Sequence, residues 1–330
     1  MTLKSMLPWW LRERMNARKT RRYLGKAIEA VSPLDVATQN LRAEVHMMVG
    51  KNHLHRALAA LHTFFHHSGV ANRVGIMLHS DGTIGPRQKE WILSRVHGAE
   101  LAEFPSKDER VRAIFQRRPY CEDFYRRRVS CMTRLVHMPV LARADRVIQL
   151  DSDFEFHAPP GEIIEWVDSA SEPPPPYLVD RRGDPDPGPE VRGIFEEIRV
   201  SLGLSPAAFA IRDYFFSGGL FAFDARRFSF DIVESYLEWQ TRAAVTKRRE
   251  IFWFRDWTAE QTATMLNFAT WPEAKALDGK YGMGLVPGAV CTHLLSSNYY
   301  KDSTLRRIRQ LLEDIAAARA QRSGRNGVSS

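Results

Sequence analysis

Residues 146–153 read Arg-Val-Ile-Gln-Leu-Asp-Ser-Asp, a short apolar run that ends in two carboxylates. The run is rich in β-branched residues, which is typical of a strand buried on both faces of a sheet. Open α/β sheets bind ligands at the carboxyl edge of their strands, so Asp151 and Asp153 are expected to turn into such a crevice. The alternative is a strand that simply ends in a solvated polar turn, where aspartate is common.

Paired carboxylates at that edge predict a metal site. A hard divalent ion such as Mg²⁺ or Mn²⁺ prefers oxygen ligands, and it usually completes its shell with waters and substrate phosphates. The tripeptide Asp151-Ser152-Asp153 therefore predicts a place where a metal ion and a phosphate meet.

The chain before this run alternates between strand and helix patterns. Residues 43–50 and 73–78 are apolar enough for buried strands. A helix is expected to begin after Asn52, as its cap, and to end near Gly69, and a second helix is expected over 86–96. A strand, helix, strand, helix order is the signature of a parallel, doubly wound sheet, so the fold class is α/β.

Composition is that of a globular protein in a reducing compartment. The 330 residues are 44% hydrophobic, which is enough for a substantial core. The three cysteines are scattered and lack metal-type spacing, which argues against a disulfide framework. No apolar run approaches the roughly 20 residues of a spanning helix, so the expected location is cytoplasmic.

The net charge of +8 lies at the two ends of the chain. Residues 1–30 hold eight Lys or Arg against two acidic residues, and residues 301–330 hold seven against three, which leaves the middle at about −2. This distribution excludes a nucleic-acid-binding core. Trp9 and Trp10 beside the first basic run fit a peripheral contact with the inner face of a membrane, or else a partly helical arm that the two Trp pack onto its own domain.

A family resemblance emerges from residues 138–153, Met-Pro-Val-Leu-Ala-Arg-Ala-Asp-Arg-Val-Ile-Gln-Leu-Asp-Ser-Asp. This run resembles the approach to the metal-binding Asp-x-Asp of GT-A-type glycosyltransferases, in particular the glycogenin and galactosyltransferase-like branch. The resemblance implies a single GT-A-like domain over residues 41–303, with a Rossmann-type mixed sheet flanked by helices. A basic arm would precede it at 1–40, and a basic helix and tail would follow at 304–330. It also implies a nucleotide-diphosphate-sugar donor held by Mn²⁺ or Mg²⁺.

Residues 213–224 carry the second family signature, Asp-Tyr-Phe-Phe-Ser-Gly-Gly-Leu-Phe-Ala-Phe-Asp. The family reads Phe-Asn-x-Gly here, next to the donor sugar, and this chain has Ser217 where the family usually has Asn. A single hydroxyl thus replaces a two-ended amide, which weakens any inference about the sugar. The other interpretation of Gly218 and Gly219 is a glycine-containing core strand.

The third signature, over residues 257–268, places Glu260 and Gln261 at the head of a helix. The family has an acidic residue followed by Gln near the reacting sugar carbon, so the resemblance implies that Glu260 is the carboxylate beneath the sugar. This chain has Thr262 where some members have a second Asp. Helix capping by Thr258 and Gln261 would explain the same polar residues.

The resemblance also supplies His293 as a third metal ligand, and imidazole suits Mn²⁺; a buried structural histidine is the alternative. Arg134 could reach the diphosphate with its guanidinium fork. Lys301 could reach it with its ammonium group, although the family's glycine-containing motif near Lys301 is absent. The residues expected to bind the donor are Val49, Gly50, Arg134, Ser152, Ser217, Gly218, Gly219 and Lys301.

The proline-rich segment 169–190 is expected to be a surface loop, either a lid that shapes the acceptor pocket or a linker. The function predicted from the whole chain is a metal-dependent glycosyltransferase with an unknown acceptor. Its stereochemistry stays open, although the resembling branch retains configuration. A non-catalytic nucleotide-sugar-binding or scaffold protein of the same fold is the main alternative. A haloacid-dehalogenase-like phosphohydrolase fits less well, because Phe154 and Glu155 follow the second Asp.

Overall fold

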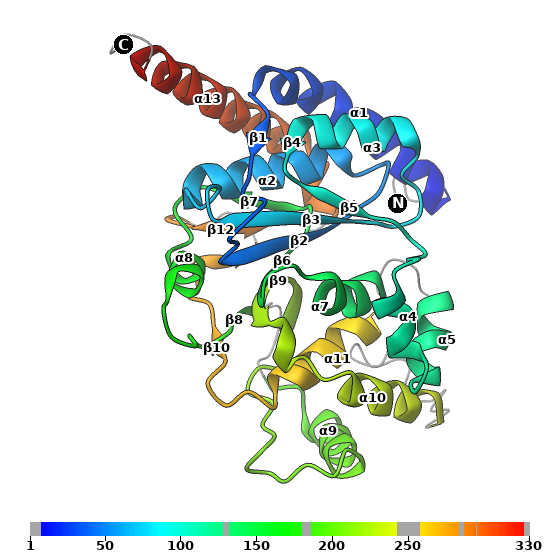
Figure 1. The fold of residues 1–330 in the computed structure, drawn as a ribbon. Helices are drawn as coiled ribbons and strands as arrows, with labels where there is room; N and C mark the ends of the chain where they lie inside the picture. Colours follow the sequence, from blue (N-terminus) through cyan, green and yellow to red (C-terminus); the bar gives the residue numbers. More distant parts are fainter. Residues whose placement is uncertain are drawn as a thin grey trace.

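The structure is a computed structural model that describes residues 8–127, 132–179, 186–242, 258–283, 287–294 and 296–326. A seven-stranded sheet runs through the middle of the molecule with helices on both faces (Figure 1). Its strand order is β10, β8, β9, β6, β2, β3, β5. The bounds are β2 (Ala43–Val49), β3 (Val74–Ser80), β5 (Glu100–Ala102), β6 (Arg146–Leu150), β8 (Pro176–Val179), β9 (Phe216–Asp224) and β10 (Lys275–Ala276).

The sheet is mixed. Strand β9 runs antiparallel to both of its neighbours, β6 and β8, whereas the other strand pairs are parallel. Strands β2 and β3 are almost entirely buried, and they carry buried polar residues such as Glu44 and His46 among their apolar ones. The mixed α/β fold class predicted from the sequence is confirmed.

Two further small sheets lie beside the central one. Strand β7 pairs antiparallel with β12, which pairs parallel with β11, and β1 pairs with β4. Their bounds are β1 (Leu34–Asp35), β4 (Val96–His97), β7 (Phe154–Phe156), β11 (Tyr281–Met283) and β12 (Cys291–His293). The β7–β12 pair brings the strand that follows the central Asp-x-Asp next to a segment much later in the sequence.

Helices form one layer above the sheet and another below it in the view of Figure 1. The upper layer has α1 (Trp9–Ala30), α2 (Leu54–Ser68), α3 (Pro86–Arg95) and α13 (Asp302–Asn326). The lower layer has α4 (Glu109–Phe115), α5 (Pro119–Arg127), η2 (Thr133–His137), α7 (Met138–Leu141), α9 (Pro189–Ser201), α10 (Phe230–Arg242) and α11 (Ala259–Phe268). The short elements α8 (Gly161–Asp168), η3 (Ala225–Arg227) and α12 (Ser296–Tyr299) complete the described fold.

Each layer encloses its own hydrophobic cluster against one face of the sheet. The upper cluster joins Ile28 of α1, Leu58 of α2 and Leu312 of α13. The lower cluster joins Val136, Tyr236 and Leu266 from η2, α10 and α11. The two terminal helices therefore pack on the same core as α2.

The α1 helix corrects one of the two interpretations of the basic N-terminal run. Its buried residues are Thr20, Leu24, Gly25, Ala27 and Ile28, in its second half. The side chains of Trp9 and Trp10 are 70% and 50% exposed. The two Trp therefore do not pack the arm onto its domain, and the aliphatic face near the end of the helix does so.

Some local predictions are wrong. Asn52 does not cap α2, because the residue before the helix is His53 and no side chain caps it. The helix predicted over 86–96 ends at Arg95, because Val96 enters β4. The segment that leads into β6 forms a π-helical turn, η2, followed by α7. The end of α2 agrees with the sequence, since Gly69 has the left-handed φ of 66° that glycine adopts readily.

The proline-rich segment also differs from the prediction of an unpacked loop. Residues 176–179 form strand β8, in which Tyr177 and Leu178 are buried, and Pro189 starts α9. Pro176 is the first residue of β8, a position where the missing N–H is tolerated. Residues 180–185 lie outside the described residues.

Cys121 and Cys291 are buried free thiols, and Cys131 lies outside the described residues. None of the described helices combines the length and the apolar character needed to cross a bilayer.

Candidate active site

The two aspartates and the histidine singled out in the sequence come together at the carboxyl end of β6. Asp151 directly follows β6, and its N–H donates to the Gly219 carbonyl of β9 at 2.8 Å. Asp153 directly precedes β7, and His293 is the last residue of β12, in register with Phe154 of β7. One ligand atom from each of Asp151, Asp153 and His293 lies within 4.8 Å of the others.

The imidazole of His293 is held in place by an aromatic ring and a glycine. It stacks on Phe154 with ring centroids 4.5 Å apart and planes 10° from parallel. A Cβ at position 219 would lie 2.9 Å from the Phe154 ring and 3.1 Å from His293. Gly219 is therefore needed for the ring of His293 to lie beside β9, where its Nε2 is 3.4 Å from Asp153 Oδ1.

Arg56, a residue that sequence reasoning missed, supports the middle of the Asp-Ser-Asp motif. Its side chain is 8% exposed, and it donates to Ser152 Oγ at 3.0 Å and to the Tyr300 hydroxyl at 2.9 Å. The guanidinium also lies over the ring of Tyr299, 5.1 Å from its centroid. The sequence does hold one signal for this role. Arg56 lies in the first turn of a helix that follows a buried strand, and such a turn faces the carboxyl edge of the sheet.

The two aspartates differ in their proton affinity. Burial raises the pKa of Asp153, but the His293 hydrogen bond and the positive charge of Arg56 outweigh it and lower the pKa to about 2. Burial dominates at Asp151 and raises its pKa, although Arg134 opposes the rise. The cluster therefore holds one firmly ionised carboxylate at Asp153.

Arg134 projects from the π-helical turn and joins three groups of the site. Its Nη1 donates to the two Asp151 carboxylate oxygens at 3.0 and 3.1 Å and to the Gly218 carbonyl at 3.1 Å. Its Nη2 lies 3.0 Å from Glu260 Oε1. One guanidinium thus bridges the Asp-x-Asp motif and the start of α11. Single π-helical turns are often found at functional sites.

Glu260 is almost completely buried in the first turn of α11. Burial raises its pKa to about 7 even though Arg134 lowers it. The adjacent Gln261 does not belong to a capping box, because the side chain of Thr258 makes no capping hydrogen bond. Instead the Gln261 amide donates to the Phe216 carbonyl of β9, and its side chain lies 3.6 Å from where a Gly218 Cβ would be.

The remaining expected donor-binding residues lie in different surroundings. Ser217 is buried, and its hydroxyl accepts from the Gly219 N–H at 3.4 Å within the same strand. A Cβ at Gly50 would come 2.1 Å from an Asp81 carboxylate oxygen, so glycine there lets Asp81 lie over the end of β2. Val49 at that end accepts the Asp81 N–H at 2.9 Å.

Lys301 is exposed, and its N–H donates to the Asn298 carbonyl at 3.3 Å. Within the described part of the chain, no hydrogen bond or ion pair joins its side chain to the acidic cluster. The structure therefore brings together the two aspartates, His293, Arg134 and the start of α11, and it leaves Lys301 apart from their contacts.

Comparison with known proteins shows which fold carries this site. Neither a protein-family model nor a curated protein sequence matches the chain. Among solved structures, an active-site mutant of LgtC is similar over 83% of this chain and 95% of that chain, with a TM-score of 0.50 and 11% identity. The galactosyltransferase LgtC with donor and acceptor sugar analogs has a TM-score of 0.48 at 10% identity, over 83% of this chain and 95% of that chain.

Mouse xyloside xylosyltransferase 1 is similar over 78% of this chain and 98% of that chain, with a TM-score of 0.46 and 14% identity. At these identities likeness establishes the fold alone, and the LgtC mutant carries that conclusion. The chain has the mixed α/β fold of glycosyltransferases, which confirms the fold that the sequence resemblance implied.

Proposed function

We propose that this protein is a metal-dependent glycosyltransferase that moves a sugar from a nucleotide-diphosphate-sugar donor to an acceptor. The observation that carries the proposal is the convergence of Asp151, Asp153 and His293 at the carboxyl end of β6, on a glycosyltransferase fold. Arg134 and Glu260 lie directly beside this cluster. A cation stabilises the charge of a departing diphosphate, and a nearby carboxylate stabilises positive charge on the sugar.

The residues of the cluster fit a divalent cation. Two carboxylates and one imidazole, with ligand atoms within 4.8 Å of one another, suit Mn²⁺ or Mg²⁺ and leave coordination positions for phosphate oxygens. Asp151, Asp153 and His293 would hold the cation, which supplies Lewis-acid stabilisation of the departing diphosphate when bound. The stacking of His293 on Phe154 fixes the imidazole before any ligand arrives.

The protein's own charges prepare the site for this reaction. The His293 hydrogen bond and the charge of Arg56 keep the pKa of Asp153 low, so this ligand is already negatively charged before a cation binds, and Arg56 also positions Ser152. Arg134 holds Asp151 and Glu260 in one place and balances part of their charge. We assign donor binding to the residues for which the sequence predicts it: Val49, Gly50, Arg134, Ser152, Ser217, Gly218, Gly219 and Lys301.

We propose that Glu260 and Gln261 lie beside the carbon of the donor sugar whose bond to phosphate breaks. When ionised, Glu260 would stabilise the positive charge that develops on the sugar as the diphosphate leaves. Its pKa of about 7 makes its ionisation sensitive to pH in the neutral range. We propose retention of configuration, as in the branch that the sequence resembles, and the anomeric form of the product, measured by NMR, tests it.

A thermal-shift screen of nucleotide-sugars with and without Mn²⁺ tests the proposal. A donor at 100 times its dissociation constant should stabilise the wild-type protein by about 2.7 kcal/mol, only when metal is present. Asp153→Asn should abolish that stabilisation. Asp231→Asn, which changes a well-exposed aspartate, is the matched control and should respond like wild type. No metal-dependent shift with any donor would contradict the proposal.

A non-catalytic nucleotide-sugar-binding or scaffold protein is the second candidate function. Ser217, which replaces the usual Asn, bonds within its own strand, and Thr262, which replaces an acidic residue, is buried. Release of free nucleotide diphosphate from the stabilising donor, with or without an acceptor sugar, separates the two functions. An enzyme should release it, and Glu260→Gln should keep the thermal shift but slow the release. Metal-dependent binding with no donor consumption would favour the scaffold.

A further inference from the structure

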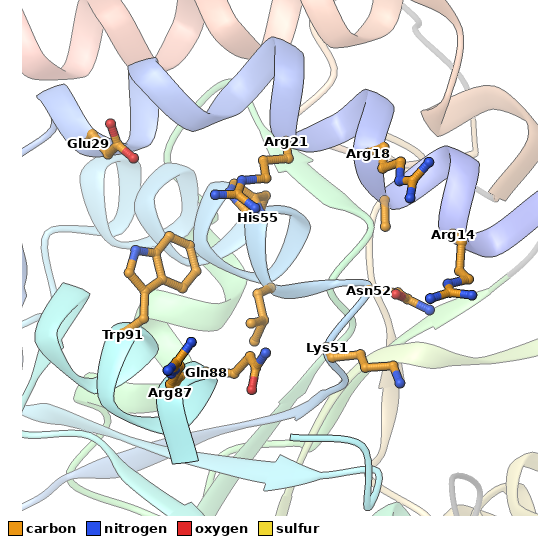
Figure 2. Close-up of a pocket in the computed structure, with 12 residues that line it drawn as sticks. Arg14, Arg18, Arg21, Glu29, Lys51, Asn52, His55, Arg87, Gln88 and Trp91 are labelled. Carbon is orange, nitrogen blue, oxygen red and sulfur yellow. The ribbon is translucent and has the colours of Figure 1, made fainter. Parts of the chain in front are cut away.

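A basic groove of about 370 Å³ lies between α1 and α3, over the start of α2. Figure 2 shows the side chains of Arg14, Arg18 and Arg21 descending from α1, with Lys51 and Arg87 on the opposite side. Trp91 of α3 forms an apolar wall and is in ring contact with His55, 4.9 Å between centroids. Five cations from three separate parts of the chain thus face one hollow.

These five cations have no acidic partner among the residues that the structure describes. Throughout the described ranges, no salt bridge joins any of them to a carboxylate, whereas cations elsewhere on the surface, such as Arg118 and Arg126, are paired. Glu29 also lines the groove, at the end away from Lys51 (Figure 2). The other acidic residue of α1, Glu13, is engaged with His53, with 3.1 Å between Oε2 and Nε2. The groove therefore carries a net positive charge that the described chain does not neutralise.

The cations share a helix face with an exposed indole. Trp10, Arg14, Arg18 and Arg21 are spaced by four, four and three residues, which places them along one face of α1. Trp10 is half exposed, and its neighbour Trp9 is more exposed still. Neither Trp9 nor Trp10 lines the groove. A soluble phosphate ester that filled the groove would leave both indoles in water.

We propose that α1 docks the protein on an anionic lipid surface, with headgroup phosphates in the α1–α3 groove and Trp9 and Trp10 at the level of the headgroups. Indole rings favour the membrane interface, and each cation near an anionic leaflet strengthens binding. A flat lipid surface engages the indoles and the groove at once, which a soluble anion does not. This inference does not depend on the proposed sugar transfer.

The position of the groove couples docking to the candidate active site. Lys51 and Asn52 of the groove follow the carboxyl end of β2. Strand β2 pairs with β6, at whose carboxyl end Asp151 lies. A lipid surface seated on the groove therefore adjoins the sheet edge that carries the acidic cluster.

Vesicle flotation of the full chain, without any sugar donor, tests the proposal. The wild-type protein should float with vesicles that contain phosphatidylglycerol and phosphatidylcholine in equal parts, and far less with phosphatidylcholine alone. The triple variant Arg14→Gln, Arg18→Gln, Arg21→Gln should lower the partition coefficient roughly a hundredfold at low ionic strength. The double variant Trp9→Ala, Trp10→Ala should lower it about tenfold or more on the same vesicles.

A second triple variant, Arg110→Gln, Arg112→Gln, Arg126→Gln, removes the same charge from exposed positions on α4 and α5. It should bind vesicles like wild type, and unchanged far-ultraviolet circular dichroism should show that both triple variants are folded. Equal binding to the two kinds of vesicle would overturn the proposal, as would wild-type binding by the α1 variants. Thermal stabilisation by inorganic pyrophosphate without vesicle flotation would also overturn it and identify a soluble-phosphate groove.

The test is separate from the proposed enzyme activity. The nucleotide-sugar thermal shift of the α1 triple variant should match wild type in solution, because none of its three arginines contacts the acidic cluster in the described structure. A loss of vesicle binding with an unchanged donor shift would support docking whether or not sugar transfer occurs.

Discussion

The acidic cluster and the α1–α3 groove are both charged, but they differ in how far their charges are buried and paired. In the cluster, Asp151 meets Arg134, and Asp153 meets His293 and Arg56, with most of these groups removed from water. In the groove, the cations are exposed, and none forms a salt bridge with a carboxylate of the described residues. Burial makes each partner in the cluster necessary to the others, whereas water and salt screen the groove.

The two regions should therefore respond differently to the loss of a charged side chain. Removing one member of a buried, paired cluster leaves an uncompensated charge, so both stability and chemistry should suffer. Removing one exposed cation leaves the fold intact and changes only what the surface attracts. The largest effects of substitution are therefore expected in the cluster.

The largest effect is expected from Asp153→Asn. The substitution keeps the shape of the side chain but removes the carboxylate that is ionised down to a pKa of about 2. The turnover of a metal-dependent donor should fall roughly a thousandfold, because charge stabilisation at the departing diphosphate is lost. Steady-state kinetics at saturating Mn²⁺ measure it. The turnover of Ser152→Ala, which loses the Arg56 contact but keeps both carboxylates, should fall far less, and equal losses would argue against a metal role for Asp153.

Arg134→Met should destabilise the fold by about 3–5 kcal/mol, because it leaves Asp151 and Glu260 buried without their shared cation. Urea unfolding at neutral pH measures the change. The loss should grow as the pH rises above 7, because Arg134 lowers the pKa of Glu260 to about 7 and its removal leaves a higher pKa in the variant.

The double variant Arg134→Met, Glu260→Gln is the internal control for this prediction. It removes one of the two stranded carboxylates, so it should regain part of the lost stability and should depend less on pH than the single variant. If the free energy of unfolding lost in the double variant equalled the sum of the losses in the two single variants, Arg134 and Glu260 would not be coupled.

His62 provides a pH-dependent effect in the upper layer, which within any one pH unit is smaller than the loss expected for Arg134→Met. Burial, together with Arg319 and Arg95, lowers its pKa from 6.5 to about 3 in the folded protein. Between those values the unfolded chain binds a proton that the folded chain does not. The free energy of unfolding should therefore fall by up to about 1.4 kcal/mol per pH unit as the pH drops below 6.5. Above this pH both states are neutral and this contribution is flat.

Comparing His62→Gln with Thr63→Val isolates that contribution. Both substitutions alter buried polar residues on α2, but only the first removes a titrating group. Unfolding free energies measured across the acidic range should show a shallower slope for His62→Gln and a wild-type slope for Thr63→Val. Parallel slopes for all three proteins would contradict the assignment.

The sequence could predict the central part of this arrangement. The apolar run before Asp151 identified β6, and the resemblance to glycosyltransferases predicted the mixed sheet that the fold comparison confirms. The structure brings His293 to Asp153, a pairing that the resemblance implied and that local pattern alone does not reveal, because β12 and β7 are far apart in the chain. The metal and donor roles of these residues stay predictions.

The sequence could not predict the supporting contacts. Arg56 and Arg134 face the aspartates because α2 and a π-helical turn aim them there, and neither direction follows from the spacing of apolar residues. The groove could not be predicted from the sequence for the same reason. Its cations come from α1, the turn after β2, and α3, so they gather only when the upper layer packs.

The smallest effect is expected from Arg14→Gln in the groove. Arg14 is exposed, and its neighbours in the hollow are mostly other cations, so the substitution should change the free energy of unfolding by less than about 0.5 kcal/mol. Any change at low ionic strength should be towards greater stability, because one source of like-charge repulsion is removed. It should vanish at physiological salt, where the Debye length is about 8 Å. Urea unfolding at low and at physiological ionic strength measures both values. A loss as large as that of Arg134→Met would mean that Arg14 has a partner in the fold, and the groove would then resemble the cluster.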